Sequence, residues 1–298
     1  MTDVAASVLA KLKNKAKASG ISYQQCLQLF VQEEFLRKLS KSGCGDNLIL
    51  KGGLFIYMLT NFESRATIDV DFLLQKTSNS IDDVKLLINR ILNTPTGNDY
   101  IFMEAKGFEE ISPQRKYHGI STQIIAQIKN VRVPFNVDIG VGDVIIPQAE
   151  QHKINTQLPD FEAPVIKTYS LESTIAEKFD AILQRFELTG RMKDFYDIYY
   201  LAKTFGFDGT KLQTAIMKTL EQRGTPYDKD SFKRIITLAD DVDMQKRWRL
   251  FLKNIKENTL DFAVVIDEIR TFIEPVFAAI INENVWRKGW DCTICNWR

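Results

Sequence analysis

Apolar side chains recur along the first part of the chain at the three- and four-residue spacing of amphipathic helices. This spacing holds over residues 4 to 42, and Gly20 divides the stretch into two predicted helices. Ser22 is a suitable N-cap for the second helix, because a serine hydroxyl can accept a hydrogen bond from a free backbone N–H of the first turn. The chain therefore begins with two predicted helices.

The pattern changes twice further along the chain. Residues 46–165 mix short helical runs with strand-like apolar runs, which lie at 68–74, 100–104, 122–128 and 131–141. From Ser170 to about residue 285 the pattern is almost wholly helical. We therefore expect an α+β protein of two domains, a mixed sheet flanked by helices in residues 1–165 and a helical domain in residues 166–298.

Composition limits the class of protein. With 298 residues, 45% hydrophobic and 26% charged, the chain is typical of soluble globular proteins and long enough to bury a full core. The net charge of +1 creates no overall field that demands a nucleic-acid partner, although the first 48 residues have a mild basic bias. No apolar run approaches the roughly 18 residues of a membrane span, and the N-terminus lacks the apolar core of a secretory signal. We expect a cytoplasmic protein without a membrane partner.

The four cysteines are too few for a disulfide framework in a chain of this length. Cys292 and Cys295 form a single CxxC close to the C-terminus. A zinc site would need two further ligands, and the only histidines are His118 and His152. A plain tail is the expectation here.

Asp69 and Asp71 lie one residue apart in an otherwise apolar run. In a strand, residues i and i+2 project from the same face, with roughly 6.5–7 Å of rise between them. The two carboxylates would point together, while the neighbouring Ile68, Val70 and Phe72 point into the core. Converging carboxylates favour a cation between them, and oxygen ligands suit Mg²⁺ or Mn²⁺ in phosphoryl transfer. On its own, the pair also fits an edge strand that faces solvent.

Two further features strengthen the metal interpretation. Lys51, Gly52 and Gly53 precede an apolar run long enough for nearly two helical turns. Glycines before a helix let the backbone approach a ligand closely, and the free N–H groups of the first turn can bind phosphate oxygens. Asp138 is a third acid inside a strand-like run. The ordered set of glycine turn, paired aspartates and third strand aspartate indicates a nucleotidyltransferase site.

Three stretches of sequence carry a resemblance to a known family. They are "FLRKLSKSGCGDNLILKGGLFIYML" followed by "RATIDVDFLL", then "NVDIGVGD", then "LESTIAEKFDAILQRFELTGRMKDFYDIYYL". Together they resemble the AbiEii-type toxin nucleotidyltransferases of the DNA-polymerase-β-like superfamily, over residues 25 to 205. The family often has Gly-Ser where this chain has Gly52-Gly53, so backbone amides must replace a serine hydroxyl. Residues 206–298 carry no family motif.

A lysine helix follows in the resembling region. Apolar side chains mark one face of a helix that begins after Ser170, and Lys178 and Arg185, seven residues apart, would share an edge of that face. A lysine at the rim of a packed face can bury its stem and hold its ammonium over a cleft. The resemblance implies that Lys178 binds the triphosphate. Arg185 is a candidate for the same role or a solvated flank residue.

The next helix carries Asp194 and Asp197, which correspond to an acidic helix that faces the cleft in the family. Asp194 also lies near the helix start, where an acid favours the helix dipole. One of the pair is expected to be functional, with Asp194 favoured. Arg65 and Thr67, just before the paired aspartates, would orient them or contact phosphate, although a loop salt bridge suits Arg65 equally well.

The resemblance implies metal-dependent transfer of NMP from an NTP, with Asp69, Asp71 and Asp138 holding Mg²⁺ or Mn²⁺. Asp138 would complete the metal site or act as the base toward the acceptor hydroxyl. Lys51, Gly52, Gly53 and Lys178 would bind the nucleotide. The implied acceptor is RNA, in particular the 3′ end of tRNA, and a cognate antitoxin, often a winged-helix DNA-binding protein, would be the partner.

Three alternatives stay open at the level of sequence. The site fits NMP transfer to a protein side chain or to a small molecule such as an aminoglycoside. It also fits phosphoryl transfer to a protein, because a phosphate-binding turn does not decide which phosphorus is attacked. A nucleotidyltransferase-like module that only binds nucleotide or a partner protein is the non-catalytic alternative.

Overall fold

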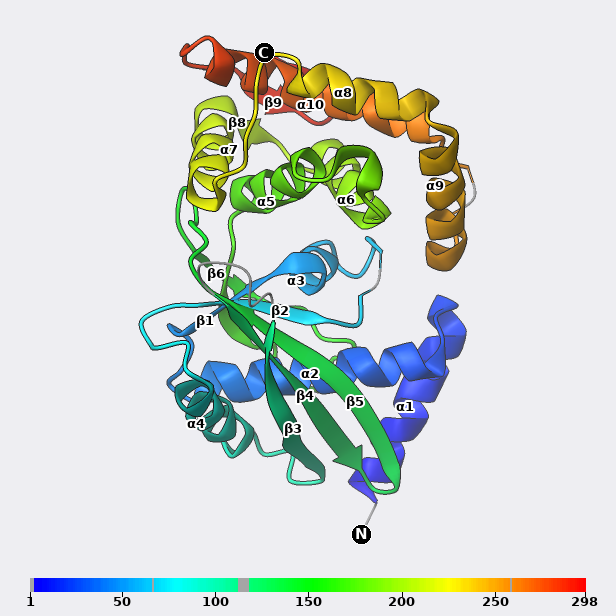
Figure 1. Ribbon diagram of the computed structural model, residues 1–298. Coiled ribbons are helices and arrows are strands. Elements are labelled where there is room, and N and C mark those ends of the chain that lie inside the picture. The colour runs from blue at the N-terminus through cyan, green and yellow to red at the C-terminus, as the bar shows by residue number, and fades with distance from the viewer. Residues whose placement is uncertain (1–2, 66, 112–117, 258) are drawn as a thin grey trace. The chain divides into compact units, whose positions relative to one another are not determined.

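The computed structural model describes residues 3–65, 67–111, 118–257 and 259–298 (Figure 1). The chain divides into two compact units. Unit 1 comprises Met1–Gly142 and Glu150–Tyr169, and unit 2 comprises Asp143–Ala149 and Ser170–Arg298. The chain therefore passes from one unit to the other at three places, where a division at residue 165 alone would give one.

Unit 1 is an α+β unit built around a mixed sheet. Its elements in chain order are α1 (Val4–Ser19), α2 (Tyr23–Lys41), β1 (Leu48–Lys51), α3 (Gly52–Leu59), β2 (Val70–Leu74), α4 (Ile81–Leu92), β3 (Ile101–Ile111), β4 (Gly119–Ile128), β5 (Val131–Gly140), β6 (Glu150–Lys153) and β7 (Val165–Thr168). The seven strands lie in the order β3-β4-β5-β2-β1-β7-β6. The β2–β5 and β1–β7 pairs are parallel and the other pairs antiparallel. The predicted mixed sheet with flanking helices is confirmed.

The first two helices end and begin where the sequence predicts. Gly20 closes α1 in the left-handed conformation, with φ 71°, which a residue without Cβ adopts at little cost. Ser22 caps α2, and its hydroxyl accepts a hydrogen bond from the backbone N–H of Gln25 at 3.1 Å. Helix α2 then packs against β5 and β7.

The face of the sheet toward α2 is apolar. The ring of Phe35 on α2 lies 6.0 Å from the rings of Phe72 on β2 and of Phe135 on β5. Val70 and Phe72 are fully buried, as predicted. Ile68 was expected to join them, but this is wrong: it is 59% exposed, because β2 begins only at Val70.

Strand β3 is longer than predicted. It runs on past Glu104 to Ile111, with a register shift between Lys106 and Glu109. The charged residues in its second half are tolerated because β3 is an edge strand of the sheet, where solvated side chains and irregular pairing are common.

Unit 2 is mostly helical. Its elements are α5 (Leu171–Leu183), η1 (Phe186–Leu188), α6 (Met192–Thr204), β8 (Phe207–Asp208), α7 (Gly209–Arg223), α8 (Ser231–Thr237), η2 (Leu238–Asp240), α9 (Val242–Ile255), α10 (Phe262–Ile281), β9 (Gly289–Asp291) and β10 (Asn296–Trp297). The three strands form a small sheet in the order β10-β9-β8. Strands of two or three residues are too short to leave a periodic pattern, so the sequence does not predict them.

The C-terminal segment is a packed hairpin, and the expectation of a plain tail is wrong. Trp290 and Trp297 are buried at 3% and 7% exposure. The Trp290 indole donates to the backbone oxygen of Ala202 at 2.7 Å, and the Trp297 indole donates to that of Phe272 at 3.0 Å.

Among the described residues, no helix is long and apolar enough to cross a membrane.

Candidate functional site

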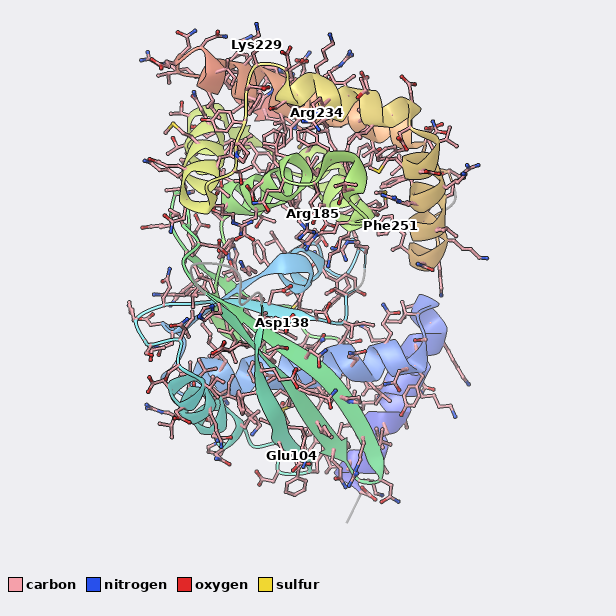
Figure 2. All side chains as sticks on the ribbon, in the orientation of Figure 1. Glu104, Asp138, Arg185, Lys229, Arg234 and Phe251 are labelled. Atoms are coloured by element: carbon pink, nitrogen blue, oxygen red, sulfur yellow. The ribbon has the colours of Figure 1, made fainter. Side chains whose placement is uncertain are left out.

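A row of polar residues crosses the centre of the sheet in unit 1. Asp71 on β2 lies in register with Lys51 on β1 and with Asp138 on β5. Asp138, labelled in Figure 2, lies in register with Ser121 on β4, whose hydroxyl donates to its Oδ1 at 2.6 Å. Four adjacent strands thus contribute one polar residue each to the same row.

This row lies on the face of the sheet away from α2. Side chains alternate between the two faces of a strand. Phe72 and Ile139 are fully buried neighbours of Asp71 and Asp138, and Phe72 meets the α2 ring of Phe35, so the two aspartates project from the opposite face. Both aspartates are partly exposed. Asp71 and Asp138, two of the three acids predicted to hold a metal, are therefore in-register neighbours on this face.

Gly52 forms the corner between β1 and α3, immediately beside Asp71. Its φ is +71°, and a Cβ added to it would lie 2.8 Å from the Asp71 Cγ. Any side chain here would therefore be strained by its backbone conformation and would also collide with the carboxylate. The glycine allows the Asp71 carboxylate to lie against the backbone at the start of α3, where the first N–H groups of a helix lack intrahelical partners.

The other predicted residues of this segment gather at the same corner. A Cβ on Gly53 would lie 3.1 Å from the Thr67 hydroxyl oxygen and 3.3 Å from an Arg65 guanidinium nitrogen. The Lys51 ammonium lies 5.1 Å from the ring centroid of Tyr169, which follows β7. The first turn of α3 is therefore surrounded by the hydroxyl and basic groups that a phosphate would contact.

Asp69 differs from Asp71, because it precedes β2 by one residue. Strand alternation therefore does not fix its direction, contrary to the argument from a strand over 68–74. Within the part of the chain that the structure describes, no group of three or more His, Cys, Asp or Glu residues is placed to hold a metal ion. Mg²⁺, however, typically takes one or two carboxylates together with substrate phosphates rather than an all-protein cage. Asp71 and Asp138, beside the α3 start, supply donors of that kind.

A second cluster of predicted residues lies in unit 2. The ammonium of Lys178 on α5 donates to Asp197 Oδ2 at 2.5 Å and lies 3.4 Å from Asp194 Oδ1, both on α6. Arg191 donates from Nε to Asp194 Oδ2 at 2.7 Å. The predicted lysine and both predicted aspartates therefore form one buried ion-pair cluster.

The position of the Lys178 ammonium differs from the expected one at the rim of a packed face. The residue is only 8% exposed, and its ammonium is held by two carboxylates rather than extended over a rim. A phosphate that binds Lys178 must therefore compete with Asp194 and Asp197 or join them around the ammonium.

Arg185 does not share an edge of α5 with Lys178. The helix ends at Leu183, and Arg185 is an exposed residue with φ −124° just before η1. The seven-residue spacing failed here because the apolar pattern continues to Phe186, although Phe186 lies in η1 with a positive φ of 40°. The arginine therefore belongs to the loop between α5 and α6.

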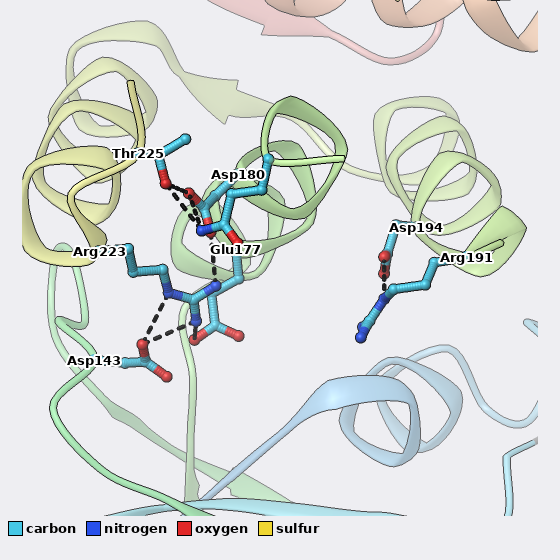
Figure 3. A network of polar contacts seen from close by, with 8 residues as sticks. Asp143, Glu177, Asp180, Arg191, Asp194, Arg223 and Thr225 are labelled. Carbon is cyan, nitrogen blue, oxygen red and sulfur yellow. Dashed lines mark hydrogen bonds and ion pairs between the residues drawn. The ribbon is translucent and has the colours of Figure 1, made fainter. Parts of the chain in front are cut away.

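A network around Arg223 holds helix α5 from the side of α7 (Figure 3). Its guanidinium lies 2.8 Å from Asp143, 2.9 Å from Glu177 and 2.9 Å from Asp180. Thr225 also donates to Asp180. Glu177 is the residue before Lys178, so this network fixes the turn of α5 that carries the lysine.

The sequence did not predict several polar residues of these clusters. Ser121 was missed because β4 was expected to begin at residue 122, and Tyr169 because it lies beyond the end of β7. Arg191, just before α6, and Arg223, at the end of α7, were not selected, since a single arginine at a helix end is usually solvated. An arginine three residues before an acid, as Arg191 is before Asp194, is the one local hint.

The chain is similar to known proteins in sequence and in fold. The family model described as nucleotidyl transferase AbiEii toxin, type IV TA system, matches residues 34–282. MenT4, a nucleotidyltransferase toxin from Mycobacterium tuberculosis, has 15% sequence identity and a TM-score of 0.54, with 91% of this chain and 98% of that chain covered. JHP933 from Helicobacter pylori has 16% identity and a TM-score of 0.47, with 85% of this chain and 97% of that chain covered. No curated protein sequence matches the chain.

Proposed function

Because the chain belongs to the AbiEii family of nucleotidyltransferase toxins from type IV toxin–antitoxin systems, we propose that it transfers NMP from an NTP to an RNA acceptor, the 3′ end of tRNA. One observation carries this proposal: the row of Lys51, Asp71 and Asp138 beside the glycine corner at Gly52. The row places carboxylates and a cation beside a helix start, which is what triphosphate binding requires.

Asp71 and Asp138, together with Asp69, would hold Mg²⁺ or Mn²⁺ with the triphosphate oxygens. The bound ion would neutralise the phosphate charge and polarise the phosphoryl group. The backbone N–H groups of Gly52 and Gly53 bind phosphate oxygens at the start of α3.

The protein residues around these carboxylates would position the nucleotide and handle the proton. Lys51, Arg65 and Thr67 supply further contacts to phosphate. Asp138 accepts the proton of the acceptor hydroxyl as its oxygen attacks the α-phosphorus and pyrophosphate leaves. The hydrogen bond from Ser121 at 2.6 Å orients the Asp138 carboxylate for this role.

In unit 2 we assign roles to Lys178, Asp194 and Asp197 as one cluster. The cluster consists of a buried ammonium and two buried carboxylates. A buried ion pair seldom adds net stability, so packing alone does not explain why these charges are buried here. Lys178 contributes positive charge to nucleotide binding, and the two aspartates set its position. Arg185, exposed in the loop between α5 and α6, is a further candidate for a contact to phosphate.

The family membership supports an antitoxin as the partner. A winged-helix DNA-binding protein is the form that we propose for it. RNA as acceptor is supported by the exposed basic side chains of α9, where Lys246, Arg249 and Lys253 follow one another at helical spacing on the side opposite the buried Trp248.

The test is incubation of the purified protein with total tRNA, Mg²⁺ and each α-labelled NTP in turn, beside Asp71→Asn, Asp138→Asn and the exposed control Asp82→Asn. We expect label in RNA with the natural protein and the control only, and none after chelation of the metal with EDTA. Label in protein or in small molecules would show that RNA is not the acceptor. Label from γ-labelled NTP alone would show that the reaction is phosphoryl transfer and not transfer of NMP. Nucleotide binding without any transfer would overturn the enzymatic assignment.

A further inference from the structure

The turn between β9 and β10 presents two cysteines at its ends. Cys292 and Cys295 are the first and last residues of the four-residue connection, and both are half-buried free thiols. A turn of four residues brings its first and last Cα atoms to within about 7 Å. A disulfide requires a Cα separation of about 4.4–6.8 Å, so this geometry suits a bond between the two sulfurs.

The hairpin that carries these cysteines is firmly held. Trp290 on β9 and Trp297 on β10 are paired across the hairpin, and their indole rings lie 5.4 Å apart. Trp297 also stacks on Phe272 of α10 at 5.8 Å with an interplanar angle of 10°. The two strands that flank the turn are therefore packed against α10, and the two thiols lie in an ordered hairpin.

A lysine lies against one of the two sulfurs. The ammonium of Lys203 on α6 is 3.2 Å from Cys295 Sγ and 3.0 Å from Glu268 on α10. A neighbouring ammonium favours the thiolate over the thiol, and the thiolate is the nucleophile in cysteine chemistry. These contacts also raise the pKa of Lys203 to about 12, so it keeps its positive charge at neutral pH. Cys295 is therefore the more reactive sulfur of the pair.

The other two cysteines provide an internal contrast. Cys26 and Cys44 are 0% and 2% exposed in unit 1, and burial raises the pKa of the Cys26 thiol. Such thiols behave as small apolar side chains and react slowly.

We propose that Cys295 and Cys292 form a redox-active pair that a peroxide converts into an intramolecular disulfide. The Cys295 thiolate attacks one peroxide oxygen, the O–O bond breaks, and the leaving hydroxide takes a proton to become water. Cys295 is then a sulfenic acid. The Cys292 sulfur attacks Cys295 Sγ, an S–S bond forms, and the sulfenic oxygen leaves with the Cys292 proton as a second water. Two thiols are oxidised by two electrons and one peroxide is reduced to two waters.

The test treats the full-length protein with hydrogen peroxide, then alkylates the remaining thiols and measures intact and peptide masses. We expect loss of two hydrogen atoms in the peptide that contains both cysteines, reversed by dithiothreitol, with Cys26 and Cys44 still reduced. In Cys292→Ser the reaction stops at the sulfenic acid, which dimedone traps at Cys295. In Cys295→Ser no sulfenic acid forms at Cys292.

The role of Lys203 has its own readout. Lys203→Gln should slow alkylation of Cys295 at neutral pH, because the amide removes the positive charge that lies 3.2 Å from the sulfur. Lys203→Arg should restore the rate, and the exposed control Lys218→Gln should leave it unchanged. Far-UV circular dichroism shows whether each variant is folded. Equal alkylation of Cys292 and Cys295 before and after peroxide, or a rate that does not depend on residue 203 in folded variants, would overturn the proposal. Nucleotidyl transfer plays no part in these measurements, so they test the cysteine pair independently of the transfer activity.

Discussion

Lys178 of α5 donates to Asp197 of α6 across 2.5 Å, between side chains that are only 10% and 2% exposed. Asp194 lies on the other side of the ammonium, and its second oxygen accepts from Arg191, whose side chain is 44% exposed. The cluster thus balances two buried carboxylates with one buried and one partly solvated cation.

Removal of the buried cation should therefore be costly. Lys178→Met leaves two buried carboxylates without their central partner, and we expect a loss of about 3–5 kcal/mol in the free energy of unfolding. Urea denaturation measures this loss. The double variant Lys178→Met/Asp197→Asn should recover part of it, since one of the two buried negative charges is gone. A single variant as stable as the natural protein would show that the cluster is solvated in solution.

Ser121→Ala tests the orientation of Asp138. The change removes the hydrogen bond at 2.6 Å but leaves the carboxylate, so nucleotidyl transfer should fall by about 10–100-fold, the usual effect of removing a supporting contact. Asp138→Asn should fall further, by about 10²–10⁴-fold, if the carboxylate is the base. Single-turnover rates with saturating NTP separate these effects from weaker binding. A Ser121→Ala rate equal to that of the natural protein would remove the orienting role.

Gly52→Ala combines backbone strain with a collision, and Gly20→Ala supplies a matched control. Both glycines have φ +71°, yet a Cβ on Gly20 would meet nothing within 4 Å, whereas one on Gly52 would meet the Asp71 carboxylate. We expect each change to cost about 1–2 kcal/mol through the left-handed backbone. Gly52→Ala should lose more stability than Gly20→Ala, and only Gly52→Ala should abolish labelling of the acceptor. Equal losses of stability in the two variants would mean that the Asp71 side chain moves aside freely.

Stability should depend on pH through Glu33, a buried acid on α2. Burial raises its pKa from 4.5 to about 8 in the folded protein, against the opposing effect of Arg37. Between these values the folded state binds a proton that the unfolded state has lost, so this contribution to stability is complete below pH 4.5 and is lost as the pH rises toward 8.

Glu33→Gln should remove this loss. Relative to the natural protein, the variant should gain stability steadily as the pH rises from 5 to 8, by up to about 1.4 kcal/mol per pH unit. Urea denaturation at several pH values gives the slope. Glu162→Gln, which changes an exposed acid whose pKa Lys41 lowers, is the control and should show no gain in this range. A flat difference for Glu33→Gln would show that its carboxylate is ionised in the folded state.

The strand acids illustrate what sequence can predict. Asp71 and Asp138 were recognised because each interrupts an apolar strand, and in the structure they are in-register neighbours. Their pairing could not be deduced, because a strand pattern carries no information on which strands are adjacent. The same limit hid Ser121, which becomes relevant only once β4 is known to lie beside β5.

The limits were sharper for ion pairs. Lys178, Asp194 and Asp197 were selected by resemblance, but helical spacing gave no sign that the ammonium would be buried between the carboxylates. Arg185 was misplaced because a helical pattern continues for three residues after the helix has ended. Periodicity reports which side chains face the core, whereas the end of a helix depends on local backbone conformation.

The segment Asp143–Ala149 has a consequence for how the protein is made. It leaves unit 1 directly after β5 and docks in unit 2, where Ile146 bonds to Ser173, 27 residues later, and Asp143 bonds to Arg223, 80 residues later. At a synthesis rate of about 5–20 residues per second, Asp143 emerges roughly 4–16 seconds before its arginine. During that interval the segment can bond to Ser173 of α5, but Asp143 still lacks its arginine. The final arrangement of the segment therefore waits on the translation of α7.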